Sequence, residues 1–567
     1  MMRRAVSNSR TFPKSCQCHE DSQVLIKVTK IPQLTRTSRD EKATAAVPNS
    51  GPSTILTGKR LVIVFVAMLL SFFLIALDQT ILATALPRIA SDFEAFSLQG
   101  WVSSSFILAQ TVFLLFYGQV LRIFSAKWVL ISAIGLFEIG SLVSGVAQSV
   151  DTIITGRVVS GVGAAGIFVA IFQLIAQVTP LEDRPRLFAL FGAVFGFASV
   201  SAFTDHVTWR WVFFINLPFG GLLLLGVTFL LKAAPPLAAD PNKRSTQDLL
   251  QQVLRLDYVG ATLVTGAVTV TTLVLALQWG GNIKPWGDKD VIICFVFAAA
   301  LSVVFIAWEI YVDERAMVPT AIFKSRSIYA IQVYAFFNQF CLTLFAYYLP
   351  LLYQAARDSS ATHSGIDILP FMLGLIITNI ITGQILPRLP RRRRFLVIGS
   401  ALLYTLNTST SSTKITGFQI LVGIGTGMGL QIAVVAMQVE FREAPFLIGQ
   451  ATSMVSFAKF LGGTIALGVA EPVLASELSK FLLLYAPNAP AQIVKDSPTA
   501  IWTALDKDLI PGVVRSYTRA LRIVFILGVP AGGLALIAAF FIKNIRIPKA
   551  SDRPAKVESE LEKGSGE

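Results

Sequence analysis

Apolar segments about as long as a membrane-spanning helix recur along this 567-residue chain and limit what it can fold into. A helix needs roughly 20 apolar residues to cross about 30 Å of hydrocarbon, whereas the strands of a membrane barrel are shorter and alternate in polarity. With 54% hydrophobic and 14% charged residues, the composition is too apolar for an ordinary soluble protein. We therefore expect an all-α integral membrane protein. Its fourteen expected transmembrane helices lie near residues 61–87, 101–120, 128–147, 153–177, 187–203, 211–231, 258–277, 291–310, 328–349, 366–386, 395–406, 418–437, 451–470 and 524–542.

The first apolar segment contains a single carboxylate, Asp78, at a position that falls inside the bilayer. An ionisable side chain there costs several kcal/mol and is a functional-site hypothesis by default. The alternative is that Asp78 only hydrogen-bonds the backbone of a neighbouring helix.

The basic residues are distributed as in a multi-pass protein with both termini in the cytoplasm. Of the 48 Lys and Arg residues, about 34 lie on the side shared with the N-terminus, the excess that cytoplasmic loops carry. This asymmetry and the anionic inner leaflet explain the net charge of +14, so we expect no nucleic-acid partner.

Residues 1–60 are expected to be a disordered cytoplasmic tail, with a mitochondrial presequence as the alternative for its first part. Residues 543–567 are the second cytoplasmic tail and 471–523 an extracellular segment.

The chain also repeats itself at an offset of about 260 residues, as transporters built from paired halves do. Gly118 recurs as Gly383 within similar surroundings, Gly161 as Gly423, and residues 85–87 resemble residues 348–350. These matches predict two pseudo-symmetric six-helix halves, residues 61–231 and 328–542. Residues 232–327 are then a linker and two inserted helices, which gives a 6+2+6 arrangement.

Several motifs identify a family resemblance. Residues 77–87 resemble the first-helix signature of the fourteen-helix drug:proton antiporter branch of the major facilitator superfamily in fungi. Residues 156–163 resemble the superfamily's fourth-helix motif, and residues 209–218 (WRWVFFINLP) match the start of helix six in that branch. The residues that carry these motifs and the loop after helix two are Thr80, Pro87, Gly118, Lys127, Gly161, Gly163, Trp209, Arg210, Trp211, Asn216 and Pro218.

The resemblance implies the major facilitator fold and secondary active transport, as proton-coupled efflux of amphipathic drugs or secondary metabolites. The proton gradient would be the only energy source, with no cofactor, and the protein would act as a monomer. It would lie in the cell membrane, or alternatively in the vacuolar membrane. An iron-chelate or basic amino-acid transporter is the alternative within the same class.

Two features depart from the family pattern. Arg122 stands where the loop after helix two commonly has Asp, and residues 197–203 lack the Pro and paired Gly of the helix-five antiporter motif. Helix five and helix eleven, residues 187–203 and 395–406, are also short for a span. These features predict that roughly six to eight residues are missing from each, judged against the roughly 20 that a span needs. They keep open a transport-impaired relic or a sensor.

Asp78, Glu138 and Arg157 lie at similar depths in the first half, within about 5 Å at 1.5 Å per residue. They are the candidate proton-coupling site, because burial raises a carboxylate pKa and a nearby Arg lowers it. A static ion-pair network is the alternative.

Polar and aromatic residues of facing helices form the candidate substrate cavity, since such linings suit bulky amphipathic molecules. They are Gln110, Phe336, Phe337, Gln339, Phe345, Gln431, Phe457 and Lys459. Lys459 would bind an anionic substrate or titrate, unless its side chain snorkels to the interface. A membrane enzyme is not supported, because three scattered histidines and no paired carboxylate motif leave no catalytic site. No metal site is expected either, since residues 16–19 resemble only half of one.

Overall fold

The computed structural model describes residues 55–93, 99–198, 208–236, 246–265, 273–280, 284–385, 411–491, 494, 501–502 and 505–543. All of them belong to the unit that spans residues 54–567. Residues 1–54 of the predicted N-terminal tail, residues 544–567 of the predicted C-terminal tail, and the expected helix at 395–406 lie outside these residues. Residues 58–60, predicted as part of the N-terminal tail, form the start of the first helix.

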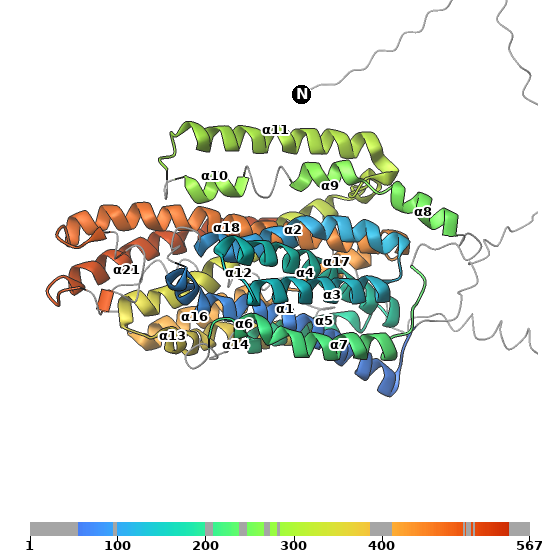
Figure 1. Ribbon diagram of the computed structural model, residues 1–567, viewed down its shortest axis with the longest axis horizontal. Coiled ribbons are helices and arrows are strands. Elements are labelled where there is room, and N and C mark those ends of the chain that lie inside the picture. Colours follow the sequence, from blue (N-terminus) through green and yellow to red (C-terminus); the bar gives the residue numbers. More distant parts are fainter. Residues whose placement is uncertain are drawn as a thin grey trace, which may run out of the picture. The chain divides into compact units, whose positions relative to one another are not determined.

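The first half begins with four long helices at the predicted apolar segments. These are α1 (Gly58–Asp92), α2 (Gln99–Ile123), α3 (Ala126–Gly145) and α4 (Val150–Val178). Helix α4 packs along both α2 and α3, and Figure 1 shows them running side by side. Helix α5 (Arg184–Ala198) has 15 described residues, and helix six is divided into α6 (Trp211–Phe214) and α7 (Asn216–Leu230).

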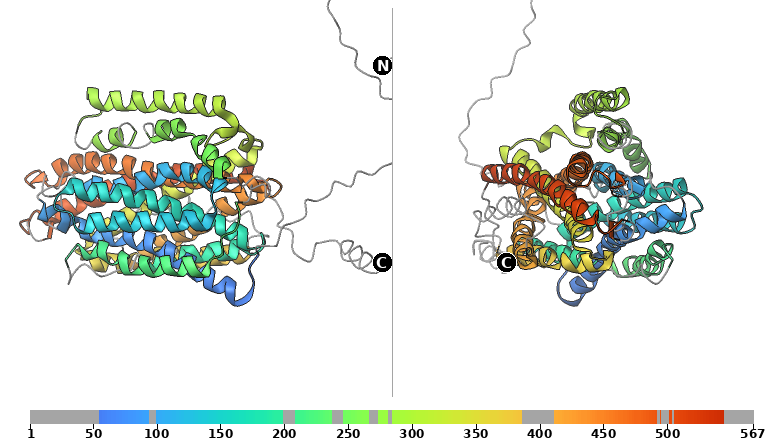
Figure 2. Two further views of the ribbon diagram at one scale, coloured as in Figure 1. Left: turned by 45° about the vertical axis from the view of Figure 1, so that its right-hand side comes forward. Right: turned by 90° about the vertical axis from the view of Figure 1, so that its left-hand side faces the viewer.

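The inserted region forms a separate layer. A short helix, α8 (Thr246–Leu254), leads to α9 (Tyr258–Val264) and α10 (Leu273–Trp279), which lie between α11 (Lys289–Val312) and the α2–α18 side of the bundle. Both ribbon views place α11 outermost (Figures 1 and 2). Only 11% of the most apolar stretch of α11 is buried inside the protein, as expected for a helix that faces lipid on most sides.

The second half contains α12 (Arg326–Arg357), α13 (Ala361–Asp367), α14 (Leu369–Ile385), α16 (Ser412–Gly427), α17 (Ile432–Glu440), α18 (Ile448–Tyr485), α21 (Ile510–Ile526) and α22 (Gly528–Phe541). Ten helical stretches among the described residues are long and apolar enough to span a membrane. They coincide with ten of the fourteen predicted spans. The full count of fourteen stays a prediction, because the other four segments are short or fall partly or wholly outside the described residues.

Much of the segment expected to be extracellular, residues 471–523, is helical. With 38 residues, α18 is about 57 Å long at 1.5 Å per residue and continues well past the predicted end at residue 470. Helix α21 returns along it. Its buried residues, including Val513, Tyr517, Ala520, Leu521 and Val524, recur at helical spacing, so one amphipathic face covers α18.

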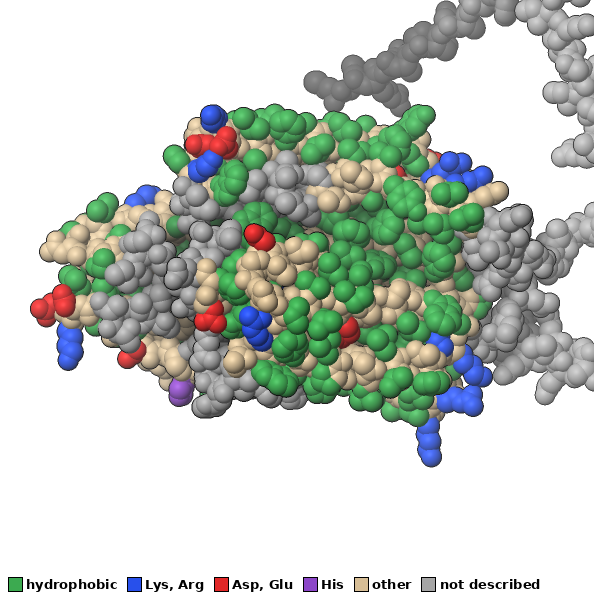
Figure 3. All heavy atoms as spheres, viewed as in Figure 1, with side chains coloured by type: hydrophobic (Ala, Val, Ile, Leu, Met, Phe, Trp, Pro, Cys, Tyr) green, Lys and Arg blue, Asp and Glu red, His purple; other side chains and the backbone are tan. Residues whose placement is uncertain are grey.

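The surface pattern agrees with a membrane-embedded bundle. In Figure 3, apolar side chains cover the sides of the helices, while most Lys, Arg, Asp and Glu side chains gather toward the two ends. A bilayer requires this arrangement, since charged groups on a lipid-facing surface are costly.

Candidate functional site

The predicted carboxylate and guanidinium meet in the middle of the first half. Arg157 on α4 forms an ion pair with Asp78 on α1, and the two side chains are 2% and 0% exposed. The Arg157 Nε atom also donates to the Val102 carbonyl at 3.3 Å, and its Cζ lies 4.3 Å from the centroid of the Phe106 ring. A buried pair needs such additional contacts to offset the desolvation of both charges.

Asn216 completes this pair from a third helix. It is the first residue of α7 and fully buried. Its Nδ2 atom donates to Asp78 Oδ1 and to Ser141 Oγ on α3, both at 3.3 Å. The sequence had indicated Asn216 only as a motif residue. The available signal was its polarity inside an apolar segment, which by itself marks a functional position in a membrane.

Glu138 lies one helical turn from Ser141 on α3 and is 8% exposed. Neither of its carboxylate oxygens has a hydrogen-bond partner among the described residues, and the carboxyl packs directly against Gly220 on α7. The expected three-charge cluster is therefore one ion pair, Asp78 with Arg157, beside a separate carboxyl group that Arg157 does not contact.

Next to Asp78, a pair of amides joins α1 to α2. Gln79 Nε2 donates to Gln110 Oε1 at 3.2 Å. Gln110 is fully buried, and its own Nε2 has no partner among the described residues. The polar site thus extends from Asp78 toward α2.

The WRW motif ties the ends of α1 and α3 to helix six. Trp209 Nε1 donates to Asp92 Oδ2 at 2.7 Å. Arg210 Nη1 donates to the carbonyls of Gly145 and Ala147 at 2.9 and 2.7 Å. These contacts hold the start of α7, and with it Asn216, in register with α3. In the same run, Trp211 is 57% exposed and Pro218 is also exposed.

The motif glycines allow close helix contacts. A Cβ atom on Gly163 would lie 2.5 Å from the Phe137 backbone nitrogen on α3, and one on Gly161 would lie 2.5 Å from the Phe106 carbonyl oxygen on α2. Small residues at such crossings are typical of membrane helices.

The remaining motif residues lie on α1 and α3. Lys127 Nζ on α3 donates to the Thr228 carbonyl at 2.7 Å. Thr80 and Pro87 lie within α1, and their side chains are outside the described part.

In the second half, the side chain of Lys459 on α18 contacts a break between two other helices, α16 and α17. Residues 428–431 separate α16 from α17, and Lys459 Nζ on α18 donates to the Leu430 carbonyl at 3.0 Å. Lys459 is 6% exposed, so its ammonium stays in the interior instead of reaching the interface. Gln431 Oε1 and Asn338 Oδ1, both buried, have no partner among the described residues.

The predicted cavity aromatics divide into two groups. Phe336 and Phe337 on α12 are partly buried, with ring centroids 5.0 Å apart, and Gln339 and Phe457 are also partly buried. Phe345 is fully buried and stacks on Phe525 of α21 with centroids 6.0 Å apart. Its position is that of a packing residue within the second half, because its helix face is turned toward α21.

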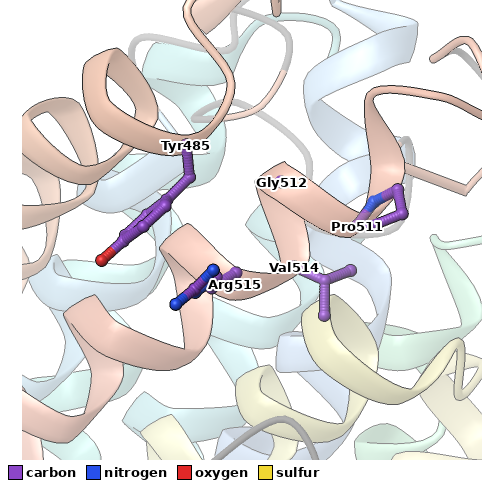
Figure 4. Close-up of a pocket in the computed structure, with 5 residues that line it drawn as sticks. All are labelled: Tyr485, Pro511, Gly512, Val514 and Arg515. Atoms are coloured by element: carbon purple, nitrogen blue, oxygen red, sulfur yellow. The ribbon is translucent and has the colours of Figure 1, made fainter.

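A surface cavity of about 450 Å³ lies elsewhere, between the end of α18 and the start of α21. Figure 4 shows Tyr485 from α18 facing Arg515 from α21, with Pro511, Gly512 and Val514 completing the lining. The Arg515 guanidinium lies 4.5 Å from the Tyr485 ring centroid. None of the predicted site residues lines this cavity.

Several of the described contacts between the two halves lie at the bundle end where α1 begins. Arg184 Nη1 on α5 donates to Gln438 Oε1 on α17 at 3.2 Å, and Asn379 Nδ2 on α14 donates to the Ala189 carbonyl at 2.9 Å. On the other side of the interface, a Cβ atom on Gly118 would lie 2.6 Å from Ser453 Oγ on α18. The two halves are therefore held together at this end.

Comparison with known proteins agrees with this architecture. The profile of the Major Facilitator Superfamily matches residues 68–467. The MFS-type transporter phomT of Diaporthe leptostromiformis is 37% identical over 75% of this chain and 73% of its own. The MFS-type efflux pump MFS1 of Trichophyton rubrum is 35% identical, covering 85% and 91%. The efflux pump aflT of Aspergillus parasiticus is 33% identical, covering 87% and 97%.

Solved structures resemble the fold at low sequence identity. The proton:xylose symporter XylE has a TM-score of 0.54 and 13% identity, over 85% of this chain and 95% of that one. A bacterial homologue of the lysosomal transporter Spinster has a TM-score of 0.52 and 12% identity, over 87% of this chain and 100% of that one.

The chain belongs to the Major Facilitator Superfamily. It is a multi-pass membrane transporter and not an enzyme, and its curated relatives are fungal transporters and efflux pumps.

Proposed function

We propose that the protein exports small amphipathic organic molecules, such as drugs or secondary metabolites, in exchange for protons. The observation that carries the proposal is the buried ion pair of Asp78 and Arg157, bridged by Asn216 to a third helix. Efflux is supported by relatives whose names describe efflux pumps. The protein would act as a monomer in the cell membrane with both termini in the cytoplasm, and a proton gradient would be its only energy source.

A proton on Asp78 would change how the helices are joined. A protonated Asp78 attracts Arg157 far less than a carboxylate does, so the guanidinium would keep only Val102 and Phe106 as partners. Breaking one side of a buried pair costs about 3–5 kcal/mol, enough to shift an equilibrium between two conformations. Glu138, one turn of α3 from Ser141 and without a hydrogen-bond partner among the described residues, would be the second proton acceptor.

Substrate would bind between the halves, toward α12 and α18. The partly buried rings of Phe336, Phe337 and Phe457 offer apolar faces, while Gln339 and Gln431 offer a few polar atoms. This composition favours bulky molecules with few hydrogen-bonding groups. Lys459, whose ammonium contacts only the Leu430 carbonyl among the described groups, would favour substrates with an acidic group.

Replacing Asp78 with Asn tests the proton role. In liposomes with an imposed pH gradient, Asp78→Asn should abolish gradient-driven transport of a panel of amphipathic compounds, because an amide of the same shape cannot exchange a proton. Binding of the same compounds without a gradient should persist. The matched control is Asp151→Asn, an exposed carboxylate in the first turn of α4, which should transport normally. Undiminished gradient-driven flux in Asp78→Asn would refute proton coupling at this site.

A further inference from the structure

The membrane span formed by α16 and α17 is interrupted at residues 428–431, near its middle. Backbone groups freed by such a break must find other partners inside a membrane. The Leu430 carbonyl accepts a hydrogen bond from Lys459 Nζ on α18 at 3.0 Å. The Thr426 carbonyl accepts one from Asn338 Nδ2 on α12 at 3.4 Å. Two neighbouring helices therefore place polar side chains against the break.

The break lies where the two halves of the protein meet. A Cβ atom on Gly192 of α5 would lie 3.2 Å from the Leu430 side chain. Phe460, which follows Lys459 on α18, packs edge-on against Phe168 of α4 with ring centroids 5.3 Å apart. Because α4 and α5 belong to the first half, Lys459 lies near the interface between the halves. This is the region to which the proposed function assigns the substrate.

The amide of Asn338 has one polar atom left over. Asn338 is 2% exposed, and its Oδ1 atom has no hydrogen-bond partner among the described residues. The orientation of the amide is fixed, because only Nδ2 can donate to the Thr426 carbonyl. A Cβ atom on Gly429 would lie 2.4 Å from Asn338 Oδ1. A buried acceptor oxygen therefore lies against the break and remains open to a donor.

The ammonium group of Lys459 also retains unused donors. It has three N–H groups, and its only polar contact among the described residues is the Leu430 carbonyl. None of the ion pairs described for the chain includes Lys459. On α17, Glu440 lies ten residues beyond Leu430, and on α18, Glu471 lies twelve beyond Lys459. At 1.5 Å per residue these carboxylates are about 15 and 18 Å away along the helices, too far to neutralise the ammonium.

A ligand that satisfies both groups must carry an anionic oxygen and a neighbouring hydrogen-bond donor. The ammonium favours a carboxylate, because a charge-assisted hydrogen bond is stronger than a neutral one, and the Asn338 oxygen favours a hydroxyl group. We propose that Lys459 and Asn338 select hydroxylated organic acids among the molecules that the protein exports. Lys459 binds the carboxylate, and Asn338 Oδ1 accepts from the hydroxyl group beside it. This substrate class rests on the proposed function, since it presumes that the exported molecule passes between the halves.

The selectivity follows from the burial of both groups. A site with buried polar groups rejects a ligand that leaves one of them unpaired. Lys459 and Asn338 are 6% and 2% exposed, so a ligand reaches them only when the halves move apart at this level. The partly buried rings of Phe336, Phe337 and Phe457, on the same two helices, would then receive its apolar part.

Three ligands with one scaffold separate the two contacts. Benzilate carries a carboxylate and a hydroxyl group on a carbon that bears two phenyl rings, diphenylacetate lacks the hydroxyl group, and methyl benzilate lacks the charge. Equilibrium binding to the purified full-length protein is measured at neutral pH without a proton gradient. We expect benzilate to bind about tenfold more tightly than either analogue, because each analogue leaves one buried group unpaired.

Two substitutions should remove the two preferences separately. Lys459→Met should abolish the preference over methyl benzilate and keep the preference over diphenylacetate. Asn338→Leu should do the reverse, since it removes the acceptor and leaves the ammonium in place. The matched control is Lys480→Met, because Lys480 is an exposed lysine on the same helix that pairs with Glu477. Both preferences should be unchanged in this control.

The parent protein alone can overturn the proposal, even if a variant folds poorly. Equal affinity of the parent for benzilate and either analogue would do so. An equal loss for all three ligands in Lys459→Met would also do so, because Lys459 would then only stabilise the break. Gradient-driven export of neutral amphipathic compounds tests the proposed function apart from this site. Selective benzilate binding by a protein that exports none of these compounds would support the site and refute the proposed export.

Discussion

At the scale of single residues, the arrangement around Asp78 depends on where each side chain obtains its hydrogen bonds. Arg157 contacts a carboxylate, a backbone carbonyl and an aromatic ring, so its charge is compensated from α1 and α2. Asn216 divides its amide protons between Asp78 and Ser141, which links helix six to helices one and three. A change in the charge of Asp78 therefore affects contacts among helices one, two, three, four and six.

Replacing Asn216 with Ala should weaken this coupling without removing the proton site. A hydrogen bond to a charged group contributes about 1.5–3 kcal/mol, so pH-driven transport should slow by about tenfold, equivalent to about 1.4 kcal/mol. Ser141→Ala, which removes only the neutral partner of Asn216, should have a smaller effect. The rates are measured in liposomes with a fixed pH gradient.

The double variant decides whether Asn216 acts through Asp78. Residues that act as one unit are non-additive. In thermal unfolding, the loss of stability in the double variant Asp78→Asn/Asn216→Ala should therefore be smaller than the sum of the losses in the two single variants. A full additive loss would mean that Asn216 contributes independently of the carboxylate.

At the scale of helices, α3 and α4 are held at a distance that only glycine permits at their crossing. A Cβ atom on Gly163 would meet the backbone of Phe137 and Ala133, and backbone cannot move aside as a flexible side chain can. Gly163→Val should lower the free energy of unfolding by about 1–3 kcal/mol or more through overpacking. Thermal unfolding in detergent measures this, with Gly135→Ala on α3 as the control because nothing lies within 4 Å of its Cβ position. Equal stability of the two variants would contradict the close packing.

At the scale of the whole molecule, the predicted orientation can be tested from outside the cell. The Lys/Arg asymmetry predicts cytoplasmic termini, so a protease-cleavable tag after Glu567 should be protected in intact cells. The same tag inserted after Asn488, in the turn that follows α18, should be cleaved. Cleavage of the first tag with protection of the second would reverse the topology.

The sequence alone predicted the family, the helical membrane fold and most span positions, because these follow from local properties. Hydrophobic length determines where a helix crosses lipid, and the motifs around Asp78 and Trp209 are contiguous. The same reasoning placed Asp78 and Arg157 at one depth, since depth depends only on position along a helix.

Only the tertiary structure decided which of these side chains meet, because contacts between helices depend on rotation about each axis. Rotation brings Asn216 to Asp78, leaves Glu138 beside Gly220, and turns Phe345 toward α21 instead of the predicted cavity.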